Sequence, residues 1–142
     1  DDNKGVNKAR RSVIRVHEKI RNARHDFNHQ TANRLVEDYG TICVEDINAN
    51  QLIKKRWCNK QILDAAWGSF LSILANKAEC AGRRLVKVNP AYTSQTCSKC
   101  GTRTLHELKD RVFNCSCGYS ADRDANASQN ILALGLQSLA KA

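Results

Sequence analysis

The residues best suited to chemistry are four cysteines in two short pairs, Cys97 with Cys100 and Cys115 with Cys117. The pairs are separated by 14 residues, and a glycine directly follows each pair, at Gly101 and Gly118. A structural zinc ion takes four thiolates at tetrahedral corners, about 2.3 Å from the metal. Glycine readily takes the left-handed backbone conformation that closes a short cysteine turn. The four cysteines therefore predict one structural zinc ion, in a ribbon whose intervening residues form a hairpin.

The other cysteines favour a metal over a disulfide framework. Cys43, Cys58 and Cys80 are scattered through apolar or helical stretches, which makes the total an odd seven. An odd count, clustered pairs and a start unlike a secretory signal are typical of reduced thiols. A redox dithiol and chance pairing are the alternatives, and His106 is a less well placed substitute ligand. The ribbon either stabilises the fold alone or also contacts nucleic acid through its basic residues, Lys99, Arg103, Lys109 and Arg111.

A second group of chemically active side chains is acidic. Glu45 and Asp46 end a β-branched run, whereas Asp122 and Asp124 open a helical pattern near the end of the chain. Carboxylates at a strand end and at a neighbouring helix start can converge to bind the Mg²⁺ pair used in phosphodiester hydrolysis. Asp122 is equally a good helix N-cap, and an acid in a first helical turn stabilises the helix dipole. By themselves, these acids favour the capping interpretation.

Positive charge is concentrated near the start of the chain. The net charge is +9, and residues 4–34 hold nine basic residues but only two acids. Such a stripe favours a polyanionic partner, usually nucleic acid, although a solvated helix face has the same composition. We expect nucleic-acid contacts in this stripe and in a later polar loop, at Lys8, Arg11, Arg15, Lys19, Lys54, Lys55 and Arg56.

The apolar pattern predicts the elements that position these side chains. Residues 6–39 are predicted to form one helix, because Val13, Val16, Ile20 and Phe27 recur at spacings typical of one helical face. Strands follow at 41–46 and 85–88, with a polar loop at 48–60 and a helix at 63–81 between them, and the last helix begins at Asp122. Alternating elements indicate an α/β fold. The first helix could instead form an oligomerisation seam, although only about two heptads persist.

Length and composition are those of an ordinary globular domain. The 142 residues suffice for one core and a small appended module, with 42% hydrophobic and 26% charged residues. No run approaches the ~20 apolar residues of a membrane helix. We therefore expect a cytoplasmic protein.

Three sequence strings carry a family resemblance. They are VEDIN at 44–48, TSQTCSKCG at 93–101 and CGYSADRDANASQNI at 117–131. In this order they resemble the C-terminal half of TnpB proteins, the OrfB-type products of insertion sequences. These are RNA-guided DNA nucleases similar to the type V CRISPR effectors. The resemblance covers essentially the whole chain, including the basic helix before VEDIN.

The resemblance implies a fold and an active site. In the family, a RuvC domain with an RNase H-like fold uses three acids, two on strands and one at the start of the last helix. The matching motifs imply that Glu45 and Asp124 are two of these acids and that Asp122 is an accessory candidate. The implied fold class is α/β: a partial RuvC-like domain at 1–92 and 121–142, with an inserted zinc ribbon at 93–120.

The chain departs from the family pattern at the first catalytic Asp. In the family this residue lies on an early strand upstream of VED, and neither Asp1 nor Asp2 has a strand around it. The modules that hold the guide RNA are also not matched, so we expect a fragment or a truncated copy, inactive by itself.

The implied function is that of part of a transposon-encoded RNA-guided DNA endonuclease. Its cofactors would be zinc in the ribbon and Mg²⁺ in the intact active site. Its partners would be DNA, a guide RNA and the missing N-terminal part of the same protein. The alternative is a non-catalytic zinc-ribbon module that binds DNA or RNA.

Overall fold

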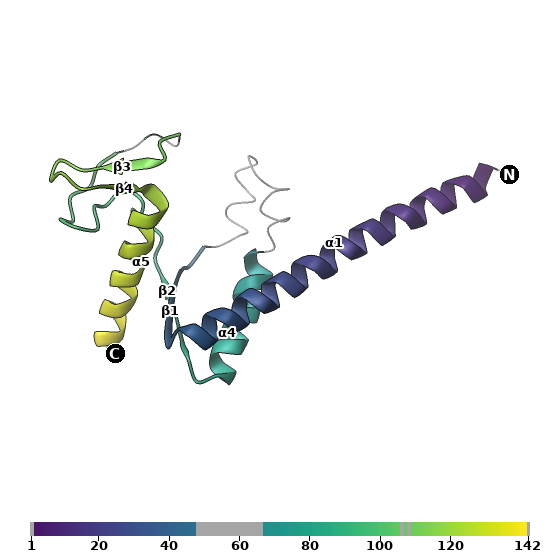
Figure 1. Cartoon of the computed structure of the whole chain (residues 1–142), viewed down its shortest axis with the longest axis horizontal. Helices are drawn as coiled ribbons and strands as arrows, with labels where there is room; N and C mark the ends of the chain where they lie inside the picture. Colours follow the sequence, from purple (N-terminus) through teal and green to yellow (C-terminus); the bar gives the residue numbers. More distant parts are fainter. Residues whose placement is uncertain (1, 48–66, 106, 108, 142) are drawn as a thin grey trace. The chain divides into compact units, whose positions relative to one another are not determined.

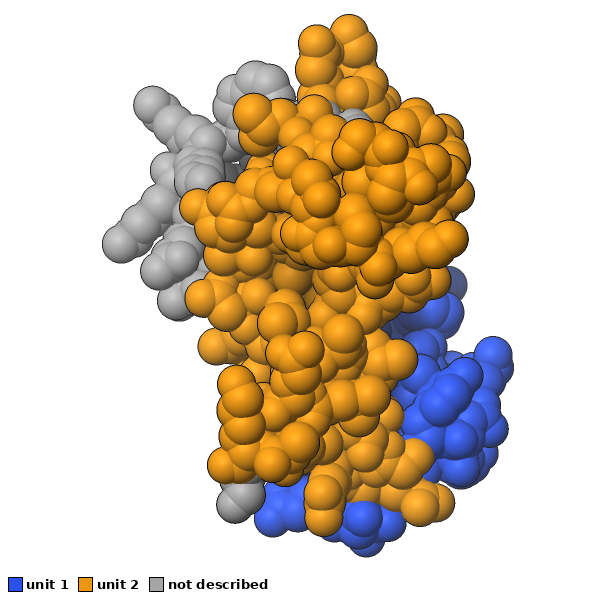
Figure 2. Space-filling view, turned by 90° about the vertical axis from the view of Figure 1, so that its left-hand side faces the viewer, with its two compact units in different colours: residues 1–39, 49–82 blue, residues 40–48, 83–142 orange. Residues whose placement is uncertain are grey.

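The computed structural model describes residues 2–47, 67–105, 107 and 109–141, and the chain divides into two compact units (Figure 2). Unit 1 consists of residues 1–39 and 49–82, and unit 2 consists of residues 40–48 and 83–142. The predicted polar loop, with Lys54, Lys55 and Arg56, lies outside the described residues. So do the predicted start of the second helix at Leu63 and the substitute ligand His106.

In its described residues, unit 1 contains the helices α1 (Asp2–Asp38) and α4 (Trp67–Cys80), which pack against each other (Figure 1). Their buried apolar residues lie in the last third of α1 and in the second half of α4, at Ala32, Val36, Leu74 and Ala78. After α4 the chain turns at Gly82, whose φ of 63° is the left-handed conformation that glycine favours. Both predicted helices are confirmed over the described residues.

The apolar stripe predicted along α1 is largely exposed. Val13, Val16 and Phe27 remain 56%, 55% and 67% exposed, and Ile20 remains 42% exposed. Periodicity therefore predicted the helix correctly but not the residues that it buries. The reason is that spacing reports which side chains share a face, whereas burial depends on what packs against that face. An oligomerisation seam on this stripe stays a hypothesis.

Unit 2 is built on a parallel pair of strands. β1 (Thr41–Glu45) pairs with β2 (Arg84–Val88), in a register that places Glu45 opposite Val88. The helix α5 (Arg123–Ala140) packs against both strands. Ile42 and Val88 are buried within this unit's apolar core. Because the strands are parallel, Glu45 and the segment that follows Val88 lie at the same edge of the sheet.

The cysteine-rich segment forms a second small sheet. β3 (Val112–Asn114) and β4 (Ser120–Asp122) are antiparallel, and Phe113 is fully buried. An isolated bridge joins Thr96 to Arg103 around the first cysteine pair. This arrangement differs from the predicted hairpin between the pairs, because each pair lies in the turn of its own strand pairing. The order of helices and strands confirms the α/β class, and no helix in the described residues is long and apolar enough to cross a membrane.

The helix α5 lies close to the strand pair at Gly135. A Cβ atom added to this buried glycine would collide with the Cys43 side chain and lie 3.6 Å from Val88 Cγ1. Glycine in a helix interior costs about 1 kcal/mol relative to alanine. The close approach of α5 to β1 explains why this position has no side chain.

Replacing Gly135 should therefore destabilise the protein although alanine favours helices. We expect Gly135→Ala to lower the free energy of unfolding by about 1–3 kcal/mol, the usual cost of overpacking a core. Chemical denaturation followed by circular dichroism measures this change. The matched control is Gly68→Ala in α4, where an added Cβ meets nothing within 4 Å, so stability should stay equal or rise. Stabilisation by both substitutions would contradict the close packing at Gly135.

Candidate metal centre and acidic site

The four predicted zinc ligands converge in unit 2. The sulfur atoms of Cys97, Cys100, Cys115 and Cys117 all lie within 4.8 Å of one another and could hold a metal ion. Two of the separations are 3.5 Å, between Cys100 and Cys115, and 3.8 Å, between Cys97 and Cys117. Four sulfurs at ~2.3 Å from a tetrahedral zinc ion lie about 3.8 Å apart. The spacing of the sulfurs therefore matches a tetrahedral metal site.

Each cysteine pair is held in a turn closed by backbone hydrogen bonds. In the first turn, the Gly101 N–H donates to the Cys97 carbonyl at 2.9 Å. In the second, the Gly118 N–H donates to the Cys115 carbonyl at 3.0 Å. Both glycines have left-handed backbone, with φ of 77° and 84°, as predicted. The second pair, one residue shorter than the first, therefore still closes a turn that presents both sulfurs.

Hydrogen bonds shift the pKa values of two thiols of the cluster in opposite directions. Hydrogen bonds from the Thr102 side chain and backbone lower the pKa of Cys100 to about 6. The backbone N–H of Tyr119 lowers the pKa of Cys117, but hydrogen bonds with Cys100 and Cys115 outweigh it and raise that pKa to about 11. The hydrogen bonds from Thr102 therefore favour the thiolate form of Cys100, which is the form that binds metals.

Two asparagines of α5 hold the first cysteine turn. Asn126 is fully buried, donates to the Thr96 carbonyl at 2.8 Å and accepts from the Ser98 N–H at 2.9 Å. Asn130 donates to the carbonyls of Thr93 and Thr96 at 2.8 and 2.7 Å. Sequence analysis did not identify these residues as part of the site. The sequence feature that could have identified them is the spacing of the two asparagines, because residues four apart place their side chains on the same face of a helix.

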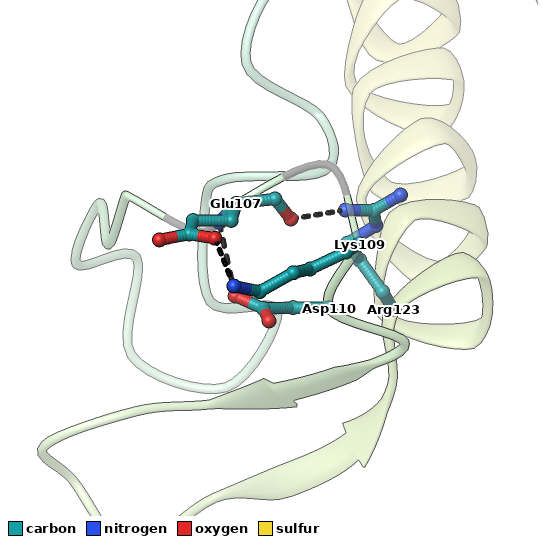
Figure 3. A network of polar contacts seen from close by, with 4 residues as sticks. All are labelled: Glu107, Lys109, Asp110 and Arg123. Carbon is teal, nitrogen blue, oxygen red and sulfur yellow. Dashed lines mark hydrogen bonds and ion pairs between the residues drawn. The ribbon is translucent and has the colours of Figure 1, made fainter.

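The loop between the cysteine pairs is attached to the start of α5 through Arg123 (Figure 3). The Arg123 guanidinium donates to the Glu107 carbonyl at 3.0 Å, and its backbone N–H donates to the Arg111 carbonyl at 2.8 Å. Asp110 accepts from the Glu107 N–H at 2.9 Å, while Lys109 pairs with the Glu107 carboxylate at 2.6 Å. Since Lys109 and Glu107 are largely exposed, this ion pair contributes little to stability. The contacts with Arg123 attach the loop to the helix.

Glu45 lies at the end of β1 and is half-buried. The Thr93 hydroxyl lies 2.6 Å from Glu45 Oε1 and 3.1 Å from the Pro90 carbonyl. The hydroxyl has one proton, which it donates to Glu45, because O–H donors to a carboxylate typically lie 2.5–2.7 Å away. Thr93 is itself buried and is held by Asn130 of α5. Glu45 is thus oriented through Thr93, a residue that sequence analysis quoted within a motif but gave no role.

The acids at the start of α5 have different environments. Asp122 is the helix N-cap, and its Oδ1 accepts from the N–H groups of Asp124 and Ala125 at 2.8 and 3.1 Å. The capping interpretation is therefore confirmed for Asp122. Asp124 follows in the first helical turn with an exposed side chain. Within the described residues, the four cysteines are the only group of three or more metal-binding side chains, and neither Glu45 nor Asp124 belongs to such a group.

The predicted basic residues of α1 share a surface in unit 1. Lys8, Arg11 and Arg15 line one hollow on the helix together with Lys4. Lys19 continues this spacing and is exposed. Spacings of three and four residues bring these side chains onto one face of the helix. We call Lys4, Lys8, Arg11, Arg15 and Lys19 the basic face.

These features define a class: an α/β protein whose strand pair and last helix accompany a four-cysteine module able to hold a metal ion. Two family models match parts of the chain. The one described as Cas12f1-like, TNB domain, matches residues 67–131, and OrfB_IS605, described as a probable transposase, matches residues 1–56. The chain is thus similar to the TnpB family over both matched ranges, which confirms the resemblance of its motifs.

The relatives of the chain are longer proteins. A putative RNA-guided DNA endonuclease of Streptomyces pristinaespiralis is 42% identical over 91% of this chain and 33% of its own length. The putative RNA-guided DNA endonuclease InsQ of Escherichia coli is 33% identical over 90% of this chain and 36% of its own length. The chain therefore spans about a third of the length of these relatives.

A solved structure supports the fold. It is described as the Cas12f1–sgRNA–target DNA complex, and its similar chain superposes with a TM-score of 0.67 at 24% identity. The match covers 92% of this chain and 41% of that one. At this identity the likeness establishes a shared fold.

Proposed function

We propose that this chain contributes two catalytic acids and a zinc ribbon to a transposon-encoded, RNA-guided DNA endonuclease. The family, and the names of its relatives as RNA-guided DNA endonucleases, support this activity. The observation that carries the proposal is the placement of Glu45. Its carboxylate is oriented by Thr93 at the end of a parallel strand, and Thr93 is tied to the helix whose first turn carries Asp124.

The proposed domain organisation is a RuvC-like domain with an insertion. Residues 1–92 and 121–142 would belong to the RuvC-like domain, and residues 93–120 would form the ribbon. A parallel strand pair covered by a helix is compatible with part of an RNase H-like sheet. The two small sheets at 41–88 and 112–122 support a boundary near residue 93.

The proposed chemistry is hydrolysis of a phosphodiester bond, with water as the nucleophile and no covalent enzyme intermediate. Glu45 and Asp124 offer carboxylate oxygens, the donors that Mg²⁺ prefers. Mg²⁺ bound by these acids would activate the water and stabilise the leaving oxygen. Because no three carboxylates cluster within the described residues, a complete site requires a further acid. We assign Asp122 to helix capping, with an indirect effect on Asp124.

The proposed nucleic-acid contacts lie on the basic face of α1. Its side chains would contact the phosphate backbone of the guide–target duplex or of the displaced strand, independently of sequence. Lys54, Lys55 and Arg56, which lie outside the described residues, are proposed as further contacts. The partners would be DNA, a guide RNA and the part of the longer relatives that this chain does not match.

The proposed ion of the cysteine cluster is zinc, in a structural role. A closed set of four thiolates at tetrahedral spacing is the donor set of structural zinc sites. A second candidate function is that of a non-catalytic zinc-ribbon module that binds nucleic acid. The basic residues of the cysteine module favour this candidate function. It is also favoured because no group of three carboxylates is found in the described residues.

Metal analysis should find one zinc ion per chain after purification without added zinc. Cys97→Ser with Cys100→Ser should abolish zinc binding and expose the amides of residues 93–122 to hydrogen exchange, since zinc binding stabilises the folded module. Zinc retention should fall as the pH is lowered, because protons compete for the thiolates. The control is Cys80→Ser, whose exposed thiol lies outside the cluster. A protein without zinc, or a double variant that retains it, would contradict the assignment.

Nucleic-acid binding should depend steeply on salt. Each phosphate contact adds about 0.7–0.9 to the slope of log affinity against log salt. Reversing Arg11, Arg15 and Lys19 to Glu should therefore flatten this slope by roughly 2–3, measured by fluorescence anisotropy.

The matched control for this charge reversal changes the same number of charges on the cysteine module. In that control Lys99, Lys109 and Arg111 are each replaced by Glu, and the slope should change less than in the α1 variant. A larger effect of the control would favour the ribbon as the main binding surface. An affinity that does not change with salt concentration would show that the basic face is only a solvated surface and does not bind nucleic acid.

Cleavage should require both proposed acids. In a longer protein that joins this chain to the N-terminal part of its relatives, Glu45→Gln and Asp124→Asn should each reduce cleavage to background, because each removes a carboxylate from the metal-binding set. Guide-dependent DNA binding should remain. Asp122→Ala should cost about 1 kcal/mol of stability, as expected for loss of an N-cap. The 142-residue chain alone should bind nucleic acid without cutting it. Undiminished cleavage by the Asp124 variant would return that residue to a helix-stabilising role.

A further inference from the structure

Tyr92 is an exposed aromatic residue in an uncommon backbone conformation. Its φ is 66°, and it is the only residue other than glycine with positive φ in the part of the chain that the structure describes. A bulky residue in this region is a conformational outlier that the surrounding structure must impose, and such residues concentrate at functional sites. The residue as a whole remains 52% exposed. The strain at Tyr92 therefore does not serve to bury an aromatic side chain.

Neighbouring groups hold the Tyr92 backbone in place. Its carbonyl accepts hydrogen bonds from the N–H groups of Gln95 and Thr96 and from the Thr96 hydroxyl, each at 3.0 Å. The Thr96 carbonyl is in turn held by Asn126 and Asn130 of α5. Tyr92 is thus presented at the surface by a segment that is anchored to a helix.

Arg103 lies over the Tyr92 ring, with Cζ 3.4 Å from the ring centroid. A guanidinium at this distance makes a cation–π contact and has a planar face of its own. Since Tyr92 stays half exposed despite Arg103, part of its ring surface remains open to a ligand. A tyrosine ring beside an arginine plane is a surface on which nucleic-acid bases stack.

The stacked pair lines a groove of about 270 Å³ on unit 2. The helix α5 also lines the groove, with the apolar residue Leu134 and the amide residue Gln137 among its contributions. Such a groove is slightly smaller than the range for ligand sites of drug size, ~300–1,000 Å³, and is suited to a smaller group. It combines one aromatic face, one cation, an apolar surface and an exposed amide. This is the chemistry of a site for a single planar, hydrogen-bonding group next to an anion.

The groove lies next to Glu45. Thr93 lines it, and the Thr93 hydroxyl donates to Glu45 Oε1 at 2.6 Å. A strand with a base in the groove would therefore bring its phosphates close to the residue that orients this acid.

We propose that Tyr92 and Arg103 form a stacking platform for one unpaired base of single-stranded DNA, and that the platform positions the strand beside Glu45. The choice of DNA rests on the proposed function as a DNA endonuclease. The strand must be unpaired, because a base can stack on a protein side chain only after leaving its own helical stack. Tyr92 is a positioning residue in this proposal and takes no part in the hydrolysis.

The first test measures binding of a short thymidine oligonucleotide to the full 142-residue chain by fluorescence anisotropy. Tyr92→Ala should weaken binding about tenfold, within the range of ~5–150-fold for loss of one stacked base. Tyr92→Phe should bind like the parent protein, because it keeps the ring. The control is Tyr39→Ala, which removes a similarly exposed ring (56%) from the other unit. Equal affinities for the parent and Tyr92→Ala would overturn the proposal.

An abasic oligonucleotide separates base stacking from charge. It should bind the parent as weakly as Tyr92→Ala binds the thymidine strand, and Tyr92→Ala should weaken it no further. An equal loss of affinity with the abasic strand would show that Tyr92 acts through folding or the backbone, and would overturn the stacking role. Tighter, Tyr92-dependent binding of the matching uridine RNA would overturn the assignment to DNA.

A second measurement needs no variant. Irradiation of the unmodified chain with an oligonucleotide that carries 5-iodouracil should cross-link the base to Tyr92, identified by mass spectrometry of the peptides. Cross-links confined to α1 would overturn the proposal even if Tyr92→Ala fails to fold. These tests do not depend on cutting. Loss of cleavage in the Glu45 variant without a Tyr92 contact would reject the platform alone, whereas a Tyr92 contact with undiminished cleavage in that variant would reject the catalytic role proposed for Glu45.

Discussion

Asn126 and Asn130, one turn apart on α5, hold the segment from Thr93 to Ser98 through four hydrogen bonds to its backbone. Asn126 is completely buried, so breaking its contacts would leave polar groups without partners, at about 1–3 kcal/mol each. The segment carries the threonine that orients Glu45 and the start of the first cysteine turn, and it directly follows the tyrosine of the groove. The position of α5 depends in turn on Gly135, which allows the helix to contact Cys43 directly. One helix thereby sets the geometry of the metal cluster, the acid and the groove together.

The string DRDAN shows how a short motif can serve several physical purposes. Asp122 caps the helix, Arg123 attaches the loop between the cysteine pairs, and Asn126 holds the first cysteine turn. Asp124 lies in the first turn of the helix with an exposed side chain. Substitution of the other three positions would disturb the fold before it disturbed any chemistry. Asp124 is therefore the position in this string at which a functional role and a structural role can be separated most cleanly.

Local chemistry accounts for what could be predicted from the sequence. The helices, the two longer strands and the glycine turns follow from apolar spacing and from the freedom of glycine at positive φ. The convergence of the four cysteines followed because metal coordination links their spacing to a known geometry. The exposed stripe on α1 could not be predicted, because spacing does not specify what packs against a face.

The roles of Thr93 and Asn126 were equally hidden. Each depends on a partner more than 25 residues away, at Glu45 in one case and Ser98 in the other. A polar residue gives no local sign of such a contact, because the same side chain is equally common on a solvated surface. The short strands β3 and β4 also escaped prediction, since three residues each are too few to show an alternating pattern.

The contact between Thr93 and Glu45 links orientation of the acid to shape of the groove. The hydroxyl engages Oε1 at 2.6 Å, which restrains the carboxylate and leaves its second oxygen available to a ligand. The same threonine is buried and lines the groove beside Tyr92. A ligand in the groove would therefore contact Thr93, the residue that orients Glu45. Through this one side chain, binding of a ligand and the orientation of Glu45 would be coupled. For the proposed DNA strand, such coupling would favour strands that are correctly placed, because catalysis is sensitive to small errors in the position of reacting groups.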